Sequence, residues 1–172
     1  MKNTDTKDRI LELLFDFPTR RFHVREIARI LKISAPAVSK AVMQMEKEEF
    51  IILKKGFVYE IQANTLNQQF KNMKRVYNLR KIYLSGLFDF LAENFSLNAI
   101  ILFGSYSKGE DTEKSDIDIA IEGKERSIEL KEYEKKLNRK INIEFVNFDK
   151  ISDELKDSII NGIALHGYIS LK

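Results

Sequence analysis

A long stretch of helical periodicity divides this chain into two parts of different character. Between residues 66 and 95, large side chains recur at alternating steps of four and three residues, as expected for one face of a helix: Leu66, Phe70, Met73, Tyr77, Arg80, Leu84, Leu87 and Leu91. Only Gly86 interrupts the pattern. So long a stripe requires a partner along its length, either this chain's own domains or a second copy in a homodimer.

The residues before this helix predict three short helices and a hairpin. Helical periodicity ends at Pro18, and a second helix is expected over residues 24–32. Ser34 is suited to cap a third helix, whose buried stripe is expected to be Val38, Val42 and Met45. Two runs of β-branched and aromatic residues then flank Lys54-Lys55-Gly56, which is typical of a β-hairpin.

After residue 95 the pattern changes to alternating strands and helices. Strands are expected over residues 99–103, 116–121 and 141–146, and helices over residues 127–138 and 151–165. The whole chain is therefore predicted to be α+β, in three segments: a domain over residues 1–62, a linker or dimerisation helix over 63–95, and an α/β domain with a small mixed sheet over 96–172.

Composition and charge limit the kinds of binding partner that this chain can have. The chain has no cysteine, which excludes disulfides and thiolate metal sites. The polar first residues lack a secretory signal core and the apolar runs are too short to span a bilayer, so we expect a cytoplasmic protein with no membrane partner. The net charge is +3 over residues 1–62 and −3 over residues 96–172, which favours nucleic acid for the first part and cations for the second.

The most informative motif is an apolar strand that runs into Gly104-Ser105. Glycine lets the backbone approach a phosphate closely, and the Ser105 hydroxyl and nearby N–H groups can donate to phosphate oxygens. After ten intervening residues, Asp116 and Asp118 lie two apart on a predicted strand, so both side chains point to one face. Such a pair can share two divalent ions roughly 3.5–4 Å apart, as in phosphoryl and nucleotidyl transfer.

A third carboxylate is expected from a neighbouring strand. In the alternating run of residues 141–146, Ile141, Ile143 and Phe145 take the buried face, and Glu144 projects to the other side. A charge in the middle of a strand costs solvation unless it is paired or bound to a metal, which favours a metal-site role for Glu144 over an exposed strand glutamate.

Together these residues resemble the DNA polymerase β-like nucleotidyltransferase superfamily, and within it the minimal prokaryotic nucleotidyltransferases. That signature is a hydrophobic residue, Gly, then Gly or Ser, followed after a short spacer by an acid–hydrophobic–acid triplet and by a third acid on a later strand. The match is Phe103-Gly104-Ser105, Asp116-Ile117-Asp118 and Glu144. Minimal members carry Ala and Arg where this chain has Ser107 and Lys108, and Lys108 keeps the charge without the planar fork.

The resemblance implies a role for each matching position. Gly104, Ser105 and Lys108 would bind the triphosphate of an NTP, with ATP as the expected substrate. Asp116 and Asp118 would hold two Mg²⁺ ions. Glu144 would complete the metal site and help to deprotonate the acceptor hydroxyl, making these three carboxylates the catalytic residues.

The first part of the chain resembles a winged helix-turn-helix of the MarR-like kind, through its Ser34-capped third helix and the hairpin with a basic tip. The resemblance implies binding to double-stranded DNA. The candidate contacts are Ala37, Lys40 and Gln44 on the third helix, Arg25 on the second, and Lys54 and Lys55 on the hairpin. A winged helix used only for protein contacts is the alternative.

Two functions from different classes remain open at this point. One is an active nucleotidyltransferase that moves NMP to a hydroxyl of a protein or small molecule. Because minimal members include antitoxins that adenylylate a toxin encoded beside them, the acceptor could be the product of an adjacent gene. The other is a transcriptional regulator whose nucleotidyltransferase-like domain only senses nucleotide.

Overall fold

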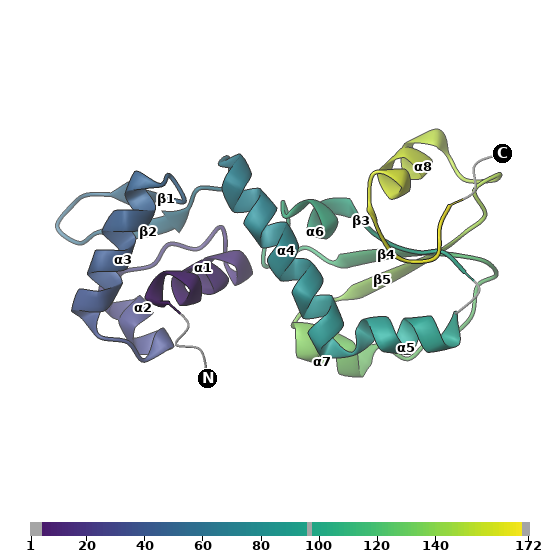
Figure 1. Cartoon of the computed structure of the whole chain (residues 1–172), viewed down its shortest axis with the longest axis horizontal. Helices are drawn as coiled ribbons and strands as arrows, with labels where there is room; N and C mark the ends of the chain where they lie inside the picture. The colour runs from purple at the N-terminus through teal and green to yellow at the C-terminus, as the bar shows by residue number, and fades with distance from the viewer. Residues whose placement is uncertain (1–4, 96–97, 170–172) are drawn as a thin grey trace. The chain divides into compact units, whose positions relative to one another are not determined.

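The computed structural model describes residues 5–95 and 98–169, and the chain divides into two compact units, Met1–Lys74 and Arg75–Lys172 (Figure 1). The predicted α+β class is confirmed. Residues 1–4, 96–97 and 170–172, which belong to the predicted segments 1–62 and 96–172, lie outside the described residues. No helix within the described ranges is both long enough and apolar enough to cross a membrane. The segment boundaries at residues 62 and 95 stay predictions.

The predicted long helix is two helices. Helix α4 spans Gln68–Ser85, helix α5 spans Leu87–Asn94, and Gly86 between them adopts φ +80°. That left-handed conformation is costly for any residue with a Cβ, which explains why the pattern breaks at its one glycine.

Unit 1 contains three helices followed by an antiparallel hairpin, and it ends within the first part of α4. The elements are α1 (Thr6–Asp16), α2 (Val24–Leu31), α3 (Ala35–Lys47), β1 (Ile51–Lys54) and β2 (Glu60–Ala63). Phe22 adds an isolated bridge to Ile61 of β2, which ties the segment before α2 to the hairpin.

The local predictions for α3 are confirmed. The Ser34 hydroxyl accepts a hydrogen bond from the Ala37 N–H at 3.4 Å, and the expected stripe of Val38, Val42 and Met45 is buried. The hairpin differs from prediction, because β2 begins at Glu60 and the aromatic run before it forms an exposed turn with Phe57 fully accessible to solvent.

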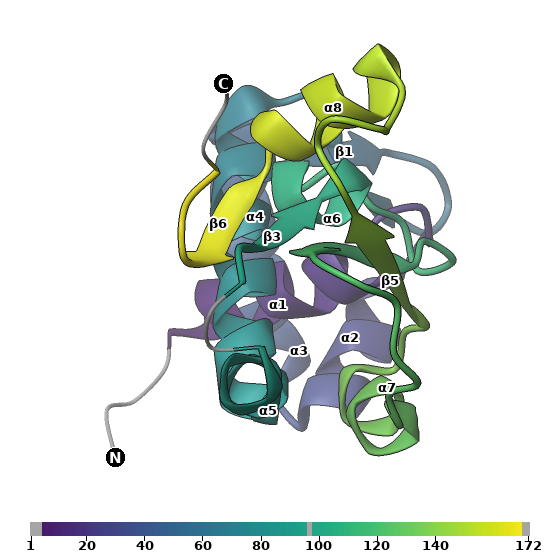
Figure 2. The same ribbon diagram turned by 90° about the vertical axis from the view of Figure 1, so that its right-hand side faces the viewer.

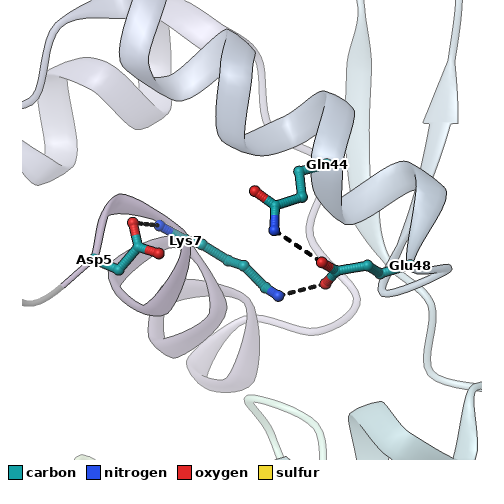
Figure 3. A network of polar contacts seen from close by, with 4 residues as sticks. All are labelled: Asp5, Lys7, Gln44 and Glu48. Atoms are coloured by element: carbon teal, nitrogen blue, oxygen red, sulfur yellow. Dashed lines mark hydrogen bonds and ion pairs between the residues drawn. The ribbon is translucent and has the colours of Figure 1, made fainter.

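A polar network joins the two ends of unit 1's helical bundle (Figure 3). The Lys7 ammonium of α1 pairs with the Glu48 carboxylate just after α3, and Gln44 Nε2 donates to the same carboxylate at 2.9 Å. The hydrogen bond from Lys7, followed by that from Gln44, lowers the pKa of Glu48 below its ordinary value. The contact therefore stabilises the fold when the pH is above the ordinary pKa of a glutamate. This stabilisation is lost as the pH falls through the lowered pKa of Glu48.

Unit 2 is built on a mixed four-stranded sheet in the order β5-β4-β3-β6. The strands are β3 (Ile100–Phe103), β4 (Ile117–Glu122), β5 (Ile141–Val146) and β6 (Ile163–His166), and the helices beyond α5 are α6 (Gly104–Lys108), α7 (Lys131–Leu137) and α8 (Asp153–Ile160). Strand β5 runs parallel to β4, whereas β3 is antiparallel to both β4 and β6. The prediction of one helix over residues 151–165 is wrong at its end, because α8 stops at Ile160 and β6 follows after Gly162.

Helices cover both faces of this sheet (Figures 1 and 2). On one face, α5 and α7 contribute to a core that contains Leu91, Leu137 and the alternate β4 residues Ile117, Ile119 and Ile121. On the other face, α8 contributes Ile159 to a second core with Phe103 and Ala120. Because side chains alternate along β4, Asp118 shares the Ala120 face of the strand.

Gly162 provides a test of how tightly α8 is joined to the sheet. A Cβ added there would lie 2.5 Å from the Leu102 carbonyl oxygen and 2.9 Å from that of Ile159, both fixed backbone atoms. We expect Gly162→Ala to lower the free energy of unfolding of unit 2 by about 1–3 kcal/mol, measured by urea denaturation. Gly56→Ala, whose nearest atom would be at 3.7 Å, is the matched control and should unfold as the wild type does; equal stability of both variants would refute the packing argument.

Candidate functional site

The turn after β3 is fixed by a close approach between Gly104 and Asp118. Strand β3 ends at Phe103, whose register partner on β4 is Asp118, and α6 begins at Gly104 with φ +69°. A Cβ on Gly104 would lie 2.5 Å from Asp118 Oδ2, so the carboxylate occupies the space that any other side chain would need. The Gly-Ser turn and the second aspartate of the motif are therefore brought together.

Asp116 and Asp118 are also brought together, through a neighbouring asparagine. Asp118 is the second residue of β4, Asp116 comes just before the strand, and both are half-buried. Asn142 of β5 stands in register with Asp118, and its Nδ2 donates to Asp118 Oδ1 at 3.1 Å and to Asp116 Oδ2 at 3.3 Å. The amide thus holds both carboxylates in one cluster.

Glu144 lies further along β5. Its register partner is Ala120, one step beyond the Asp118–Asn142 pair, and its side chain is exposed. Two residues along a strand correspond to about 6.6 Å. Within the described ranges no group of three His, Cys, Asp or Glu side chains is placed to hold a metal ion, so the structure brings two of the three predicted carboxylates together and leaves Glu144 on the same face at a distance.

The other residues of the predicted phosphate turn differ in exposure. Ser105 is half-buried in α6 and Lys108 is exposed at its end. Ser107 is buried, and its hydroxyl donates to the Gly104 carbonyl at 2.9 Å, so this residue stabilises the turn itself. Tyr106 is buried in the core beneath the sheet, which assigns its ring to packing.

The sequence analysis did not identify a buried asparagine whose two hydrogen bonds hold the segment that contains this turn. Asn78 of α4 is 2% exposed, and its Nδ2 donates to the Tyr106 carbonyl at 2.9 Å and to Asp111 Oδ1 at 2.7 Å. Both hydrogens of the amide are used, as a buried polar group requires. An asparagine within the apolar pattern of the long helix was the signal, because such a residue needs partners from elsewhere in the fold.

The residues gathered here fit a divalent cation with oxygen ligands. Asp116 and Asp118 supply carboxylate oxygens, which Mg²⁺ prefers, and Gly104 has no side chain that would displace the Asp118 carboxylate. The hydroxyl of Ser105 is on the helix that starts at this glycine. This arrangement of side chains is better suited to binding a metal ion with a phosphate group than to attacking a substrate as a nucleophile.

The predicted DNA-contacting residues are all in unit 1 but differ in availability. Arg25, Lys40 and Lys54 are exposed, whereas Ala37 is half-buried. Gln44 is engaged with Glu48, and Lys55 pairs with Glu46 at 3.0 Å.

A cleft of about 1000 Å³ lies between α2, the start of α3 and the turn of the hairpin. Arg25 and Arg29 line it together with Ser39, Phe57 and Tyr59. Of the six predicted DNA-contacting residues, Arg25 is the one that contributes to its lining. Arg25 and Arg29 of α2 therefore line the same cleft as the aromatic side chains of the hairpin.

Comparison with known proteins supports the assignment of the second part of the chain. Residues 84–166 match the family model "Nucleotidyltransferase domain". Three curated proteins of Methanocaldococcus jannaschii are similar to this chain. "Putative protein adenylyltransferase MJ1379" is 43% identical over 61 residues, which are 31% of this chain and 61% of the relative. MJ1215 and MJ0128, which have the same description, are each 48% identical over 44 residues, which are 26% of this chain and 51% and 45% of the respective relative. The chain spans about half the length of these relatives. A nucleotidyltransferase domain is thus supported within unit 2.

Among solved structures, the adhesin competence repressor (AdcR) from Streptococcus pyogenes is similar with a TM-score of 0.37 at 22% identity. The similarity covers 55% of this chain and 69% of the repressor. A likeness of that degree does not establish a shared fold.

The close approach of Gly104 and Asp118 yields a direct prediction. We expect Gly104→Ala to displace the Asp118 carboxylate and to weaken the binding of Mn²⁺ with α,β-methylene-ATP by about tenfold or more, measured by isothermal titration calorimetry. Gly56→Ala adds the same methyl group at an open position in unit 1, and should bind as the wild type does. Equal affinity of Gly104→Ala and wild type would show that the carboxylate position does not matter for this ligand.

Proposed function

We propose that unit 2 is a Mg²⁺-dependent nucleotidyltransferase that transfers NMP, with AMP favoured, from an NTP to a hydroxyl of a protein or small molecule, and that unit 1 binds double-stranded DNA. The observation that carries the enzymatic proposal is the packing of the Asp118 carboxylate against Gly104, with Asp116 held beside it. A phosphate turn and a carboxylate pair within reach of each other are what metal-assisted nucleotidyl transfer needs.

In this proposal each residue has a defined task. Gly104 and Ser105 bind phosphate oxygens of the NTP, and Lys108 neutralises charge at the outer end of the triphosphate. Asp116 and Asp118 hold Mg²⁺, which when bound supplies Lewis-acid stabilisation of the charge that develops on the phosphate. Glu144, further along the same face, accepts the proton of the acceptor hydroxyl.

The reaction is a displacement at the α-phosphorus. The acceptor oxygen forms a bond to this phosphorus as the bond to the bridging oxygen of the β-phosphate breaks. Pyrophosphate leaves with the bonding electron pair, and the hydroxyl proton passes to Glu144 and then to solvent. No covalent intermediate with the enzyme is required.

The names of the curated relatives favour AMP as the transferred group and a protein as the acceptor. An acceptor encoded by an adjacent gene, with DNA binding by unit 1 for autoregulation, would make the chain an antitoxin-type regulator. A homodimer through α4 is also part of the proposal, because this helix carries the exposed apolar side chains Val76, Tyr83 and Leu84.

A specific observation favours a second candidate, the nucleotide sensor. The residue in register with Asp118 on the neighbouring strand is Asn142, which cannot ionise, and the described residues contain no three-carboxylate cluster. A domain that binds nucleotide without transferring it would not need that third charge. The two candidates share the binding step and differ in the chemical step alone.

The enzymatic proposal is tested with α-³²P-labelled ATP, Mg²⁺ and the product of the adjacent gene. We expect label to appear on the acceptor with the wild type and to fall by at least about a hundredfold with Asp116→Asn, because a neutral amide binds the metal weakly. Asp149→Asn, an exposed residue outside the site, is the matched control and should retain activity. Nucleotide binding without transfer to any candidate acceptor would instead establish the sensor.

DNA binding by unit 1 should depend on salt through the hairpin lysines. Replacing Lys54 and Lys55 by alanine should weaken binding to the protein's own promoter and lower the slope of log affinity against log salt by about two, because each lysine neutralises one phosphate. A mobility-shift titration at several salt concentrations measures this. Lys124→Ala with Lys131→Ala removes the same charge from exposed positions in unit 2 and serves as the control; an unchanged slope in the hairpin variant would argue against phosphate binding by the wing.

A further inference from the structure

The cleft of unit 1 is lined by two arginines whose charges have no acidic partner among the described residues. Arg25 and Arg29 are four residues apart on α2, so their side chains lie on one face of the helix, one turn apart. Both are exposed, and within residues 5–95 and 98–169 no hydrogen bond or ion pair engages either guanidinium. Like charges at this spacing repel each other, so an anion bound beside them would relieve the repulsion.

Glu26 also lines the cleft, but its charge is already balanced. Its carboxylate pairs with the Arg20 guanidinium at 2.5 Å and accepts a hydrogen bond from the His23 N–H at 3.4 Å. From α3, Ser39 brings a hydroxyl to the same lining, and a hydroxyl can donate to an anion. The polar part of the cleft therefore has a net positive charge and a hydrogen-bond donor.

The turn of the hairpin adds apolar side chains to the same cleft. Phe57 is fully accessible, Val58 is 53% exposed and Tyr59 is 38% exposed, and all three line the cleft. Consecutive exposed apolar side chains form a patch of the kind that marks an interaction site. The ligand of this cleft must therefore offer apolar surface next to negative charge.

The backbone of double-stranded DNA has this combination of properties. Its phosphates supply one anion for each guanidinium, which a single small anion does not, and its sugars present carbon atoms between the phosphates. Arginine, serine and tyrosine are among the side chains that contact phosphate and sugar in protein–DNA complexes. Because Ser39 lines the cleft, a backbone held there would run beside the exposed Lys40 and Gln44 of the same helix.

We propose that this cleft holds the sugar–phosphate backbone of double-stranded DNA, with Arg25 and Arg29 on successive phosphates. The rings of Phe57 and Tyr59 pack against the sugars. The proposal rests on the proposed DNA binding by unit 1, and it adds Arg29 and the two aromatic residues to the contacts. These contacts raise the affinity for any DNA sequence, because phosphate and sugar carry no base identity.

The ionic part of the proposal is tested with Arg29→Ala in the full chain. Affinity for a fluorescein-labelled duplex from the protein's own promoter is measured by fluorescence anisotropy at several salt concentrations. Arg29→Ala should weaken binding by about tenfold and lower the slope of log affinity against log salt by about one, equally on an unrelated duplex. Lys47→Ala removes the same charge from an exposed position of α3 outside the cleft lining, and should keep the wild-type slope.

The apolar part is tested with Phe57→Ala. Because this side chain is fully exposed in the free protein, its removal should leave the melting temperature unchanged. Affinity for the duplex should fall by about threefold or more, since the ring loses its burial against the sugar, while the salt slope stays as in the wild type. Leu66→Ala, which truncates another highly exposed apolar side chain of unit 1, is the matched control and should bind as the wild type does.

The outcomes separate this proposal from the DNA binding on which it rests. Wild-type affinity in either Arg29→Ala or Phe57→Ala would overturn the cleft as the backbone site and leave DNA binding by unit 1 in place. Tighter binding of the wild type to a single strand of the same sequence would overturn the double-stranded backbone as the occupant. No DNA binding by the wild type at any salt concentration would overturn the proposed DNA binding itself, and the role of the cleft with it.

Discussion

The proposed site depends on one steric fact: the Asp118 carboxylate lies where the Cβ of any other residue at position 104 would be. At φ +69°, and with only 2.5 Å between a built Cβ and Asp118 Oδ2, a side chain at position 104 would be strained and would have to displace the carboxylate. The β3–β4 pairing sets this close approach, since Phe103 and Asp118 are register partners. Buried hydrogen bonds from Asn78 then hold the segment that follows the turn. The packing of the sheet therefore positions both halves of the motif.

Several features of the fold could be predicted from the sequence, because they depend on residues that are close together in the chain. The Ser34 cap and the buried stripe of α3 follow from capping and periodicity, whereas the single helix expected before residue 95 is divided at Gly86. What failed depended on long-range pairing: periodicity predicts helix through residue 165, whereas Ile163–His166 is a strand by virtue of its pairing with β3. The alternation of side chains along β5 predicted the face of the sheet on which Glu144 lies. The residue of β4 that it pairs with could not be predicted from the sequence of β5 alone.

The contrast between Asn142 and Glu144 bears on what kind of protein this is. A nucleotidyltransferase domain is supported by the family match over residues 84–166, yet the described residues cluster two carboxylates where the sequence motif suggested three. Asp116 and Asp118 are the two clustered carboxylates, and Glu144 lies further along the same face on β5. Nucleotide binding is thus the property common to the enzyme and the sensor, and the rate of transfer is what separates them.

The central claim, that nucleotide binds where Gly104 meets Asp118, is tested most directly by NMR of isotope-labelled protein titrated with Mg²⁺ and α,β-methylene-ATP. We expect saturable amide shifts that are largest at Gly104, Ser105 and the residues around Asp118, and that disappear without Mg²⁺. Shifts confined to other parts of the sheet, or none at all at saturating nucleotide, would refute binding at this turn.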